Sequence, residues 1–479
     1  MDAMVCPALW AVRHFSSVDL KDERLNRRLI KVGQAMASNP SGSIPDQCGS
    51  WGDTKATYRL FADPSATFEA LSQGHWQQTR QASQANQVTL LIQDTTWLSY
   101  GDHPATEGLG RHGKGKSRGD YGLHLHSVLA IKPLEDQAAI LGLAHAKLWA
   151  RTAGLYNADQ ASRSQRRKSP DRESLRWSQA IEQIGSAPAG SRLVHVGDRE
   201  ADLFDLYEQT TSLSNVGFVI RANHDRNALP GHDTAETIGK EKLKGSRLKA
   251  LIRSVAPATG MQLDVAANNG RVARVAQLKI SYCPLTLYAP QVRSRQQKAL
   301  RCWCVRVFEP NPPAGVQAIE WILLSSEAVE SIADAQRIVL WYHWRWLIEE
   351  YHRCLKSGCK VEQRQLASIQ SLEPLIAMLS ILATRLLQLK NDARIKPDAP
   401  ARDHAPQEMV QMLCRVSGGD WASLSLKDFV IGVAKHGGFL GRKHDGNPGW
   451  QTLWRGWKKL SLLCEGYQMA RLERDMGKG

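Results

Sequence analysis

The sequence predicts a multidomain α/β protein with helical units at both ends and strands in the middle. Two short apolar runs, 88–94 and 192–198, each end in an aspartate and have the length of buried strands. Alternating runs with few helix signals fill residues 224–317, whereas helical periodicity dominates near both termini. At 479 residues the chain is too long for one ordinary core, so we expect two to four domains.

The N-terminal elements are predicted to be helices. Residues 22–37 have helical periodicity and carry several cations, and shorter helices are expected at 53–61 and from Pro64 to about Arg80. We therefore expect a small helical unit over residues 1–70.

The middle of the chain, residues 71–369, is predicted to be the catalytic unit. Its expected strands and helices are strands 88–94, 127–132, 140–151, 192–198, 216–222 and 321–324, and helices 171–184 and 200–209. A mostly β insertion is expected at about 224–317. A long helix follows at 331–356, and the spacing of Ser331 and Asp334 at its start is that of a capping box.

Residues 370–479 are expected to form a helical C-terminal domain. A helix is predicted at 370–390, a polar proline-containing linker at 391–406, and a helical tail that is rich in tryptophan near its end. Exposed tryptophans would leave a large apolar patch, and tryptophan is common at interface hot spots. The tail therefore either pairs two copies of the chain or packs onto its own catalytic unit.

Composition narrows the class of partner. Lys and Arg exceed Asp and Glu by 15, with a sequence pI of about 9.4, which favours a polyanion such as nucleic acid. A merely basic soluble enzyme is the alternative. The most apolar stretch, 375–389, is too short to span a bilayer, so no membrane partner is expected. Nine scattered cysteines without zinc-finger spacing fit a reducing cytoplasm.

Candidate metal ligands stand at the ends of the two buried runs. Asp94 and Asp198 are acids of the type that Mg²⁺ prefers, and two such ions can activate the attacking oxygen and stabilise the leaving oxygen in phosphodiester transfer. Acids at strand ends also cap loops. Each aspartate taken alone therefore leaves that structural alternative open.

The predicted long helix adds a third acid. At about 100° per residue, Tyr342, Arg345, Glu349 and Lys356 fall within an arc of about 60°. One face would then carry a carboxylate for metal beside groups that bind phosphate. Glu350 points about 100° away from Glu349, so the spacing selects Glu349. The alternative is a solvated face of paired charges.

These residues resemble a known family. The pattern Tyr342-x2-Arg345-x3-Glu349-x6-Lys356 is similar to the YREK signature of the IS-four family of insertion-sequence transposases, Tn-five type. The resemblance extends in order along nearly the whole chain. It includes segments 92–100, 116–119, 126–129, 198–202, 345–352 and 382–389 and the tryptophan-rich tail.

The resemblance implies a ribonuclease-H-like catalytic core that is interrupted by the β insertion and flanked by a DNA-end-binding domain and a dimerisation domain. It implies a catalytic and metal-binding triad of Asp94, Asp198 and Glu349, with two Mg²⁺ ions per active site and Mn²⁺ as a substitute. It also implies a set of DNA contacts, namely Tyr342, Arg345, Lys356, Trp321, Trp346, Arg28, Arg59, Arg221, Lys116 and Arg118. Trp321 and Trp346 would handle a flipped base, although core packing is the alternative for both.

The expected activity is cut-and-paste DNA transposition. A homodimer would bind two transposon ends, cleave them through a hairpin intermediate, and join the 3′-OH ends to target DNA. Two rival hypotheses remain at this point. One is a nuclease of the same fold that never joins DNA. The other is an inactive relative that only binds DNA, which the intact triad disfavours.

Overall fold

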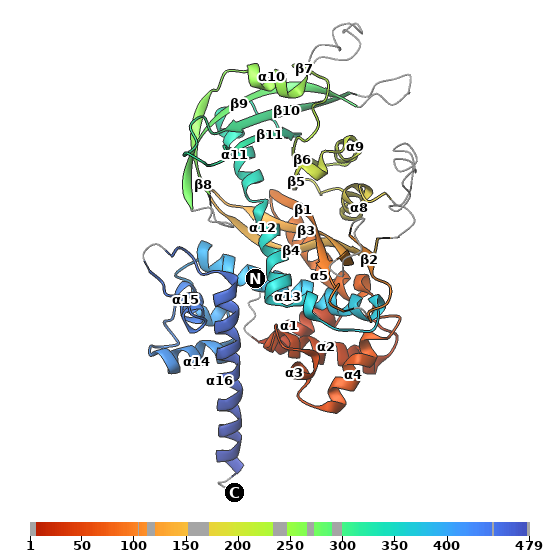
Figure 1. Ribbon diagram of the computed structural model, residues 1–479, viewed down its shortest axis with the longest axis vertical. Helices are drawn as coiled ribbons and strands as arrows, with labels where there is room; N and C mark the ends of the chain where they lie inside the picture. Colours follow the sequence, from red (N-terminus) through yellow and green to blue (C-terminus); the bar gives the residue numbers. More distant parts are fainter. Residues whose placement is uncertain are drawn as a thin grey trace.

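The computed structural model describes residues 6–103, 105–112, 120–151, 172–232, 247–265, 273–289, 299–442 and 445–476. It is a mixed α/β molecule in which one sheet runs through the middle. Figure 1 shows a β-rich region at one end of the long axis, the central strands below it, and the helical N- and C-terminal units at the other end. Lys116 and Arg118 lie outside the described residues.

One mixed sheet contains the described strands. These are β1 (Val88–Ser99), β2 (Gly110–Arg111), β3 (Tyr121–Pro133), β4 (Ala138–Trp149), β5 (Arg192–Gly197), β6 (Val216–Arg221), β7 (Ala228–Pro230), β8 (Thr259–Val265), β9 (Arg274–Tyr288), β10 (Ala299–Phe308) and β11 (Glu320–Ser325). The order through the centre is β4-β3-β1-β5-β6-β11-β10-β9, with β2 also paired to β3, and β7 and β8 paired to β9. The β4, β3 and β1 strands are antiparallel, whereas β1, β5 and β6 are parallel.

The predicted β insertion extends the main sheet. The β11 strand pairs antiparallel with β6, and β10 and β9 follow in turn. This pairing satisfies the backbone groups that β6 would otherwise expose as an edge strand. The insertion and the strands β1, β5 and β6 therefore share one hydrogen-bonded framework.

Helices cover both faces of the sheet. The central helices are α5 (Phe68–Gln84), α11 (Ile332–His343), α12 (Trp346–Arg353) and α13 (Ile369–Ile395) on one face, and α8 (Leu175–Ile184), α9 (Phe204–Ser212) and α10 (Leu248–Ser254) on the other. The terminal helices are α1 (Pro7–Phe15), α2 (Glu23–Ser38), α3 (Ile44–Cys48) and α4 (Trp51–Phe61), then α14 (Gln407–Ser417), α15 (Leu426–His436) and α16 (Trp450–Met476).

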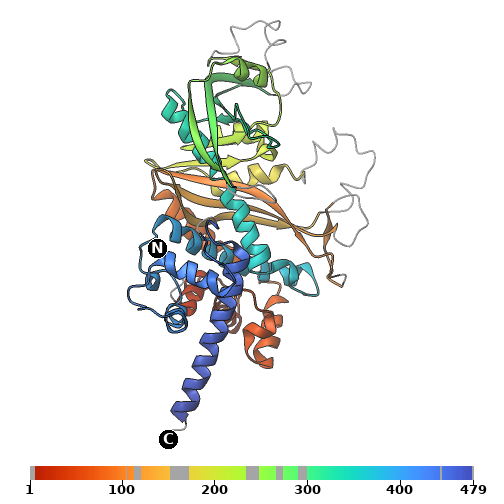
Figure 2. The same cartoon turned by 60° about the vertical axis from the view of Figure 1, so that its left-hand side comes forward.

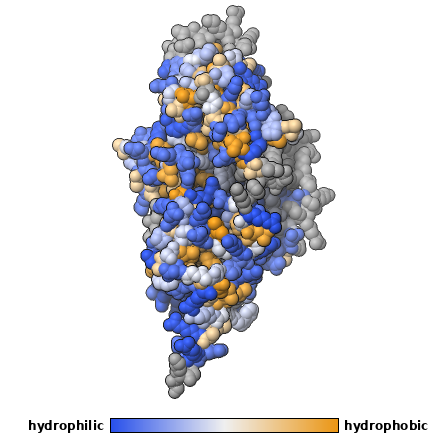
Figure 3. All heavy atoms as spheres, turned by 90° about the vertical axis from the view of Figure 1, so that its left-hand side faces the viewer, coloured by the Kyte–Doolittle hydropathy of each residue, from blue (hydrophilic) through white to orange (hydrophobic). Residues whose placement is uncertain are grey.

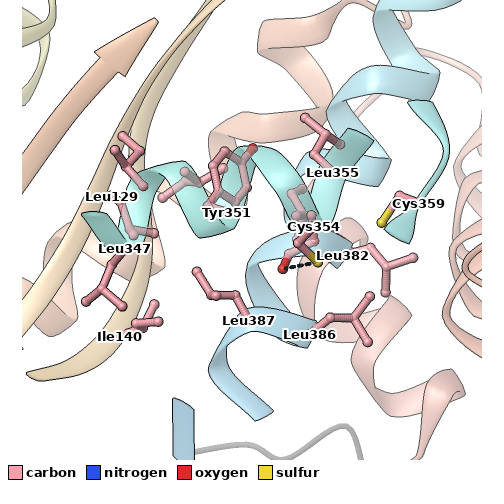
Figure 4. Packing of buried hydrophobic residues seen from close by; sticks show 14 of the residues in the cluster. Leu129, Ile140, Leu347, Tyr351, Cys354, Leu355, Cys359, Leu382, Leu386 and Leu387 are labelled. Carbon is pink, nitrogen blue, oxygen red and sulfur yellow. Dashed lines mark hydrogen bonds between the residues drawn. The ribbon is translucent and has the colours of Figure 1, made fainter. Parts of the chain in front are cut away.

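The largest core lies between the sheet and α13. Figure 4 shows Leu347, Tyr351 and Cys354, from α12 and the residue after it, in one buried cluster with Leu382, Leu386 and Leu387 of α13, with Leu129 and Ile140 contributed by the strands. The α13 helix is long and apolar enough to cross a membrane by length and composition, but 89% of its most apolar window is buried inside the protein. Its apolar surface is therefore already covered by protein.

Several predicted elements differ from the structure, most clearly the long helix and the linker. The helix expected at 331–356 is divided: α11 ends at His343, α12 begins at Trp346, and a π-helical turn covers Cys354–Gly358. The linker expected at 391–406 is partly helical, because α13 continues to Ile395 and a short 3-10 helix covers Ala401–Asp403. Asn391 and Asp392 are polar but buried, which periodicity alone does not reveal.

The capping box at the start of α11 is confirmed. The Ser331 hydroxyl accepts from the Asp334 amide at 3.2 Å, and the Asp334 carboxylate accepts from the Ser331 amide at 3.0 Å. All nine cysteines lie in the described part of the chain and are free thiols. The predicted domain boundaries stay predictions, and α13 packs against elements on both sides of the boundary expected at residue 370.

Candidate active site

Two of the three candidate acids lie side by side because their strands are neighbours. The β1 and β5 strands pair in parallel, with Ile92 opposite Val196. Two residues beyond this pair the strands reach Asp94 and Asp198. Asp198 directly follows β5, as expected, but Asp94 lies within β1, which continues to Ser99. The predicted strand end at Asp94 was therefore wrong by five residues.

Glu349 reaches the same region from α12, which packs across β1 and β3. Burial raises the pKa of Asp94 to about 7, the positive charge of Arg345 opposes this rise, and the negative charges of Asp198 and Glu349 add to it. The carboxyl group of Asp94 therefore experiences the charges of both other acids. The structure brings the three predicted acids into one neighbourhood.

Arg345 lies between two of these acids. Its guanidinium is 3.7 Å from the Asp94 carboxylate and forms a close ion pair with Glu349. Burial alone would lower the pKa of Arg345, but Tyr342, Glu349 and Asp94 raise it above its ordinary value. Among the described residues, no three Asp, Glu, His or Cys side chains are close enough to enclose a metal ion. Arg345 thus supplies the positive charge in this arrangement.

The break between α11 and α12 changes the predicted helical face. Arg345 and Glu349 keep their i,i+4 contact, but Tyr342 belongs to α11 and only 4% of it is exposed. Lys356 lies in the π-helical turn, where its ammonium donates to the Trp97 carbonyl and is 3.5 Å from Glu362. The arc of about 60° assumed one uninterrupted helix, whereas the turn at Trp344–Arg345 and the π-type hydrogen bonding each change the rotation per residue along it.

Glu349 and Glu350 have different surroundings, as their spacing predicts. The Glu349 side chain is 46% exposed and faces Arg345. Glu350 is buried and contacts Arg353, Lys390 at 3.1 Å and the Trp450 indole N–H at 2.7 Å. Glu350 therefore joins the catalytic helix to α13 and α16, a role that the sequence pattern did not reveal.

The two candidate base-handling tryptophans are partly buried. Trp321 lies on β11 with its ring 5.1 Å from that of Tyr342, and Trp346 begins α12 with the Arg394 guanidinium 5.9 Å from its ring. Both pack against the main core and keep some exposed surface. Core packing therefore accounts for part of each side chain.

Of the remaining candidate DNA contacts that the structure describes, Arg28 and Arg59 lie in the N-terminal unit, whereas Arg221 directly follows the Gly197–Ile220 register pair and so lies next to Asp198. In the N-terminal unit, Arg59 is exposed on α4, whereas Arg28 on α2 forms an ion pair with Asp53. Arg221, at the end of β6, donates to the Glu320 carbonyl at 3.0 Å. Asp53 also pairs with Lys31 at 2.8 Å, so one carboxylate holds two cations of this unit. The sequence pattern gave no signal for Asp53.

Two family models match the ends of the chain. The model described as transposase DNA-binding matches residues 7–66, which contain α1 to α4. The model described as the transposase Tn5 dimerisation domain matches residues 422–477, which contain α15 and α16.

Among solved structures, the chain is similar to a piggyBac transposase in a cryo-EM structure of its synaptic complex with hairpin DNA. The two are 11% identical, the match covers 98% of this chain and 82% of that chain, and the TM-score is 0.36. A similarity of this size carries no argument about fold or mechanism.

Proposed function

Because the chain belongs to the Tn5-type transposases of the IS-four family, we propose that it is a cut-and-paste enzyme whose active site is formed by Asp94, Asp198 and Glu349. The observation that carries this proposal is the convergence of the three acids from β1, β5 and α12. The order β4-β3-β1-β5-β6, antiparallel and then parallel, supports a ribonuclease-H-like core. The helical unit before this core would bind the transposon end.

The donor set fits hard divalent cations. All three side chains supply oxygen, and burial, with smaller contributions from the charges of Asp198 and Glu349, raises the pKa of Asp94, whose carboxylate a bound cation would stabilise. We propose that these residues hold two Mg²⁺ ions, with Mn²⁺ as a substitute. When bound, the ions would polarise the phosphodiester and activate the attacking oxygen. Arg345 contacts Glu349 Oε1, and the carboxylate has a second oxygen that a cation could bind while this ion pair persists.

The positively charged and aromatic residues around the acids would position DNA. Arg345 lies beside Asp94 and Glu349 with Tyr342 next to it, Lys356 contacts the Trp97 carbonyl of β1, and these residues would bind phosphates. Trp321 and Trp346 would stack on a flipped base, since an aromatic face replaces the stacking that the base loses. Arg28, Arg59 and Arg221 would contact the DNA end, as would Lys116 and Arg118 of the basic loop.

The proposed reaction uses one site for successive attacks on phosphorus. Water cleaves one strand at each end and leaves a 3′-OH, which then attacks the opposite strand and forms a hairpin. A second water opens the hairpin, and the freed 3′-OH attacks target DNA. The same charge pattern develops in each in-line step, so the same residues can serve all of them.

The test uses the full chain with DNA ends taken from the sequence that flanks its gene. We expect joined products with Mg²⁺. Asp94→Ala, Asp198→Ala and Glu349→Ala should each abolish cleavage and leave end binding intact, whereas Glu182→Ala, an exposed acid on α8, should be active. Cut but unjoined DNA would identify a nuclease, and a mobility shift without cutting would identify a DNA-binding protein. Either result would overturn the proposal.

A further inference from the structure

The two neighbours of Asp94 on β1 point away from the candidate metal ligands. Side chains alternate along a strand, so Asp94 faces α12 while Gln93 and Thr95 face α8. Both polar side chains lie where apolar residues would ordinarily fill the space between a sheet and a helix. Buried polar groups of this kind need hydrogen-bond partners.

These partners form one continuous line across three strands. Arg176 Nε of α8 donates to Thr95 Oγ1 at 2.9 Å, and Thr95 Oγ1 is 2.9 Å from His126 Nδ1 on β3. His126 Nε2 is 3.0 Å from Gln93 Oε1, and Gln93 Nε2 is 2.7 Å from His195 Nδ1 on β5. We call these five residues the polar line. It ends at His195 Nε2, which has no hydrogen-bond partner among the described residues.

With the Gln93 amide oriented as it is in the structure, one arrangement of protons satisfies the polar line. Gln93 Oε1 only accepts, so neutral His126 carries its proton on Nε2 and its Nδ1 accepts from the Thr95 hydroxyl, which in turn accepts from Arg176. His126 Nε2–H then donates to Gln93, whose amide donates to His195 Nδ1. Burial lowers the pKa of His126 well below its ordinary value and that of His195 to about 3, so both rings are neutral as this arrangement requires. Hydrogen bonds that run in one direction polarise and strengthen one another.

Arg176 also connects the polar line to the second candidate ligand. Its Nη2 is 2.8 Å from the Glu200 carboxylate, and the Glu200 amide donates to the Asp198 carboxylate at 2.8 Å. The guanidinium lies near the rings of Trp149 and Trp177 and donates to the Glu173 carbonyl at 2.9 Å, which fixes its plane. One side chain therefore joins the residue after Asp94 to the turn that carries Asp198.

We propose that Arg176 and Thr95 are positioning residues that set the relative placement of Asp94 and Asp198 and thereby the affinity of the site for divalent metal. This inference rests on the proposed function, because it requires the two aspartates to be metal ligands. Outer partners that orient metal ligands typically change metal affinity by about 10- to 100-fold when they are mutated. The polar line lies behind the β1–β5 pair and does not reach the metal-facing side, so its effect acts through the strands.

The test measures Mn²⁺ binding by electron paramagnetic resonance in the full chain bound to end DNA. Thr95→Val removes the hydroxyl with little change of shape and should weaken Mn²⁺ binding by about tenfold, at unchanged DNA affinity. Thr95→Ser, which restores the hydroxyl, should bind Mn²⁺ like the wild type. Thr89→Val is the matched control, since Thr89 lies on the same strand and face and its hydroxyl donates to the Ser83 carbonyl outside the polar line.

The outcomes distinguish failure of the positioning role from failure of the proposed function. If Thr95→Val binds Mn²⁺ as the wild type does, or if Thr89→Val weakens binding equally, the positioning role is wrong. If Asp94→Ala itself binds Mn²⁺ normally, the proposed function fails instead. Glu200→Gln tests the second connection at an exposed residue whose replacement leaves the core intact, and it should weaken Mn²⁺ binding several-fold. Unchanged binding in that variant would exclude Arg176 as the link to Asp198.

Discussion

Arg345 and the three acids form a cluster in which one positive charge faces three carboxyl groups. One guanidinium faces Asp94 and Glu349, while Asp198 adds a further negative charge nearby. Burial makes the imbalance expensive, because charged groups in a poorly solvated site repel one another strongly. Burial is the main cause of the raised pKa of Asp94, and the negative charges of Asp198 and Glu349 add to it.

This raised pKa predicts an unusual dependence of stability on pH. Since burial raises the pKa of Asp94 to about 7, the folded protein keeps a proton there between about pH 4 and 7 that the unfolded chain releases. The contribution of Asp94 to the free energy of unfolding therefore falls as the pH rises through this window. Asp94→Asn removes the effect, so in EDTA the variant should exceed the wild type by on the order of a few kcal/mol at pH 8 and by little at pH 4.

Denaturant unfolding at several pH values measures this difference. Asp205→Asn replaces an aspartate whose side chain is 60% exposed and is the matched control, for which we expect no such trend. A gap between Asp94→Asn and the wild type that stays constant from pH 4 to 8 would contradict the raised pKa.

Glu349 and Glu350 are neighbours in sequence with separate expected roles. On spacing alone, Glu350→Ala is expected to be mild. The structure revises this expectation for stability, because Glu350 is buried against Arg353, Lys390 and Trp450. Removing one partner of a buried charge network costs about 3 kcal/mol.

Glu350→Ala should therefore lower the free energy of unfolding by about that amount but still cleave DNA when it is assayed folded at low temperature. Glu349→Ala should show the opposite pattern, with near-normal unfolding and no cleavage. Trp450→Phe removes the indole N–H and also leaves a smaller ring at a buried position, so it should lose more than the ~1 kcal/mol of the hydrogen bond alone. A folded but inactive Glu350→Ala beside an active Glu349→Ala would refute the assignment of the catalytic glutamate.

At the scale of elements, α15 and α16 cross at backbone contact. A Cβ added at Gly456 would lie 1.7 Å from the Val433 carbonyl oxygen, and one added at Gly437 would lie 1.8 Å from the Thr452 carbonyl oxygen. The two glycines face each other's helices, so the crossing depends on the absence of side chains at both positions.

Gly456→Ala should separate these helices and destabilise the C-terminal unit by about 2 kcal/mol or more. Gly466→Ala is the matched control on the same helix, because nothing lies within 4 Å of its added Cβ. That change should be neutral or stabilising by up to about 1 kcal/mol. Hydrogen exchange of the α16 amides reports the difference, and equal protection in the two variants would contradict the close crossing.

Local patterns predicted most elements, and long-range packing explains the exceptions. The periodicity of residues 22–37 and the apolar run at 192–198 correspond to α2 and β5. The helix break at Trp344–Arg345 contains no proline or glycine, so the sequence does not predict it. We attribute the break to the packing of α11 and α12 on different strands. Helical spacing distinguished Glu349 from Glu350. It could not predict the contacts of Arg176, because Thr95 and Glu200 are 81 and 24 residues away in the sequence.

At the scale of the whole molecule, α13 connects the two terminal units. It packs against α2, α4 and α5 on one side and α15 on another, and it also contacts the π-helical turn after α12. Figure 2 shows both terminal units below the sheet, with α16 projecting beyond the rest of the protein. The unit that binds DNA and the unit that pairs protomers thus rest on one buried helix beside the candidate active site.

The first half of α16 packs onto its own chain. Trp450, Trp457 and Leu460 are buried, and Trp454 lies against Gly358 of the π-helical turn. Of the two alternatives for the tail, packing onto its own chain applies to the first half of α16, whereas pairing of two copies would apply to the second half. Truncation near Pro448 would remove core residues, so it is a poor test of pairing of two copies alone.

Hydrophobic side chains also gather on the face in Figure 3 on which the C-terminal helices lie.

The second half of α16 offers the sharper test of dimerisation. Leu462, Met469 and Leu472 are exposed, and at about 100° per residue they fall within an arc of about 80°. An apolar stripe on a projecting helix within the matched dimerisation domain is suited to contact a second copy. Met469→Glu places a charge in this stripe, whereas Ala470→Glu places the same charge outside it on the exposed surface.

Met469→Glu should leave the unfolding midpoint and binding to a single DNA end unchanged, because 66% of the side chain is exposed within one chain. It should reduce the paired-end complex at least tenfold, since a charge buried at an apolar contact without a partner costs more than about 1.4 kcal/mol. Ala470→Glu should pair ends normally. Native gels and sedimentation with end DNA measure the complexes, and equal pairing by both variants would place the dimer contact elsewhere than this stripe.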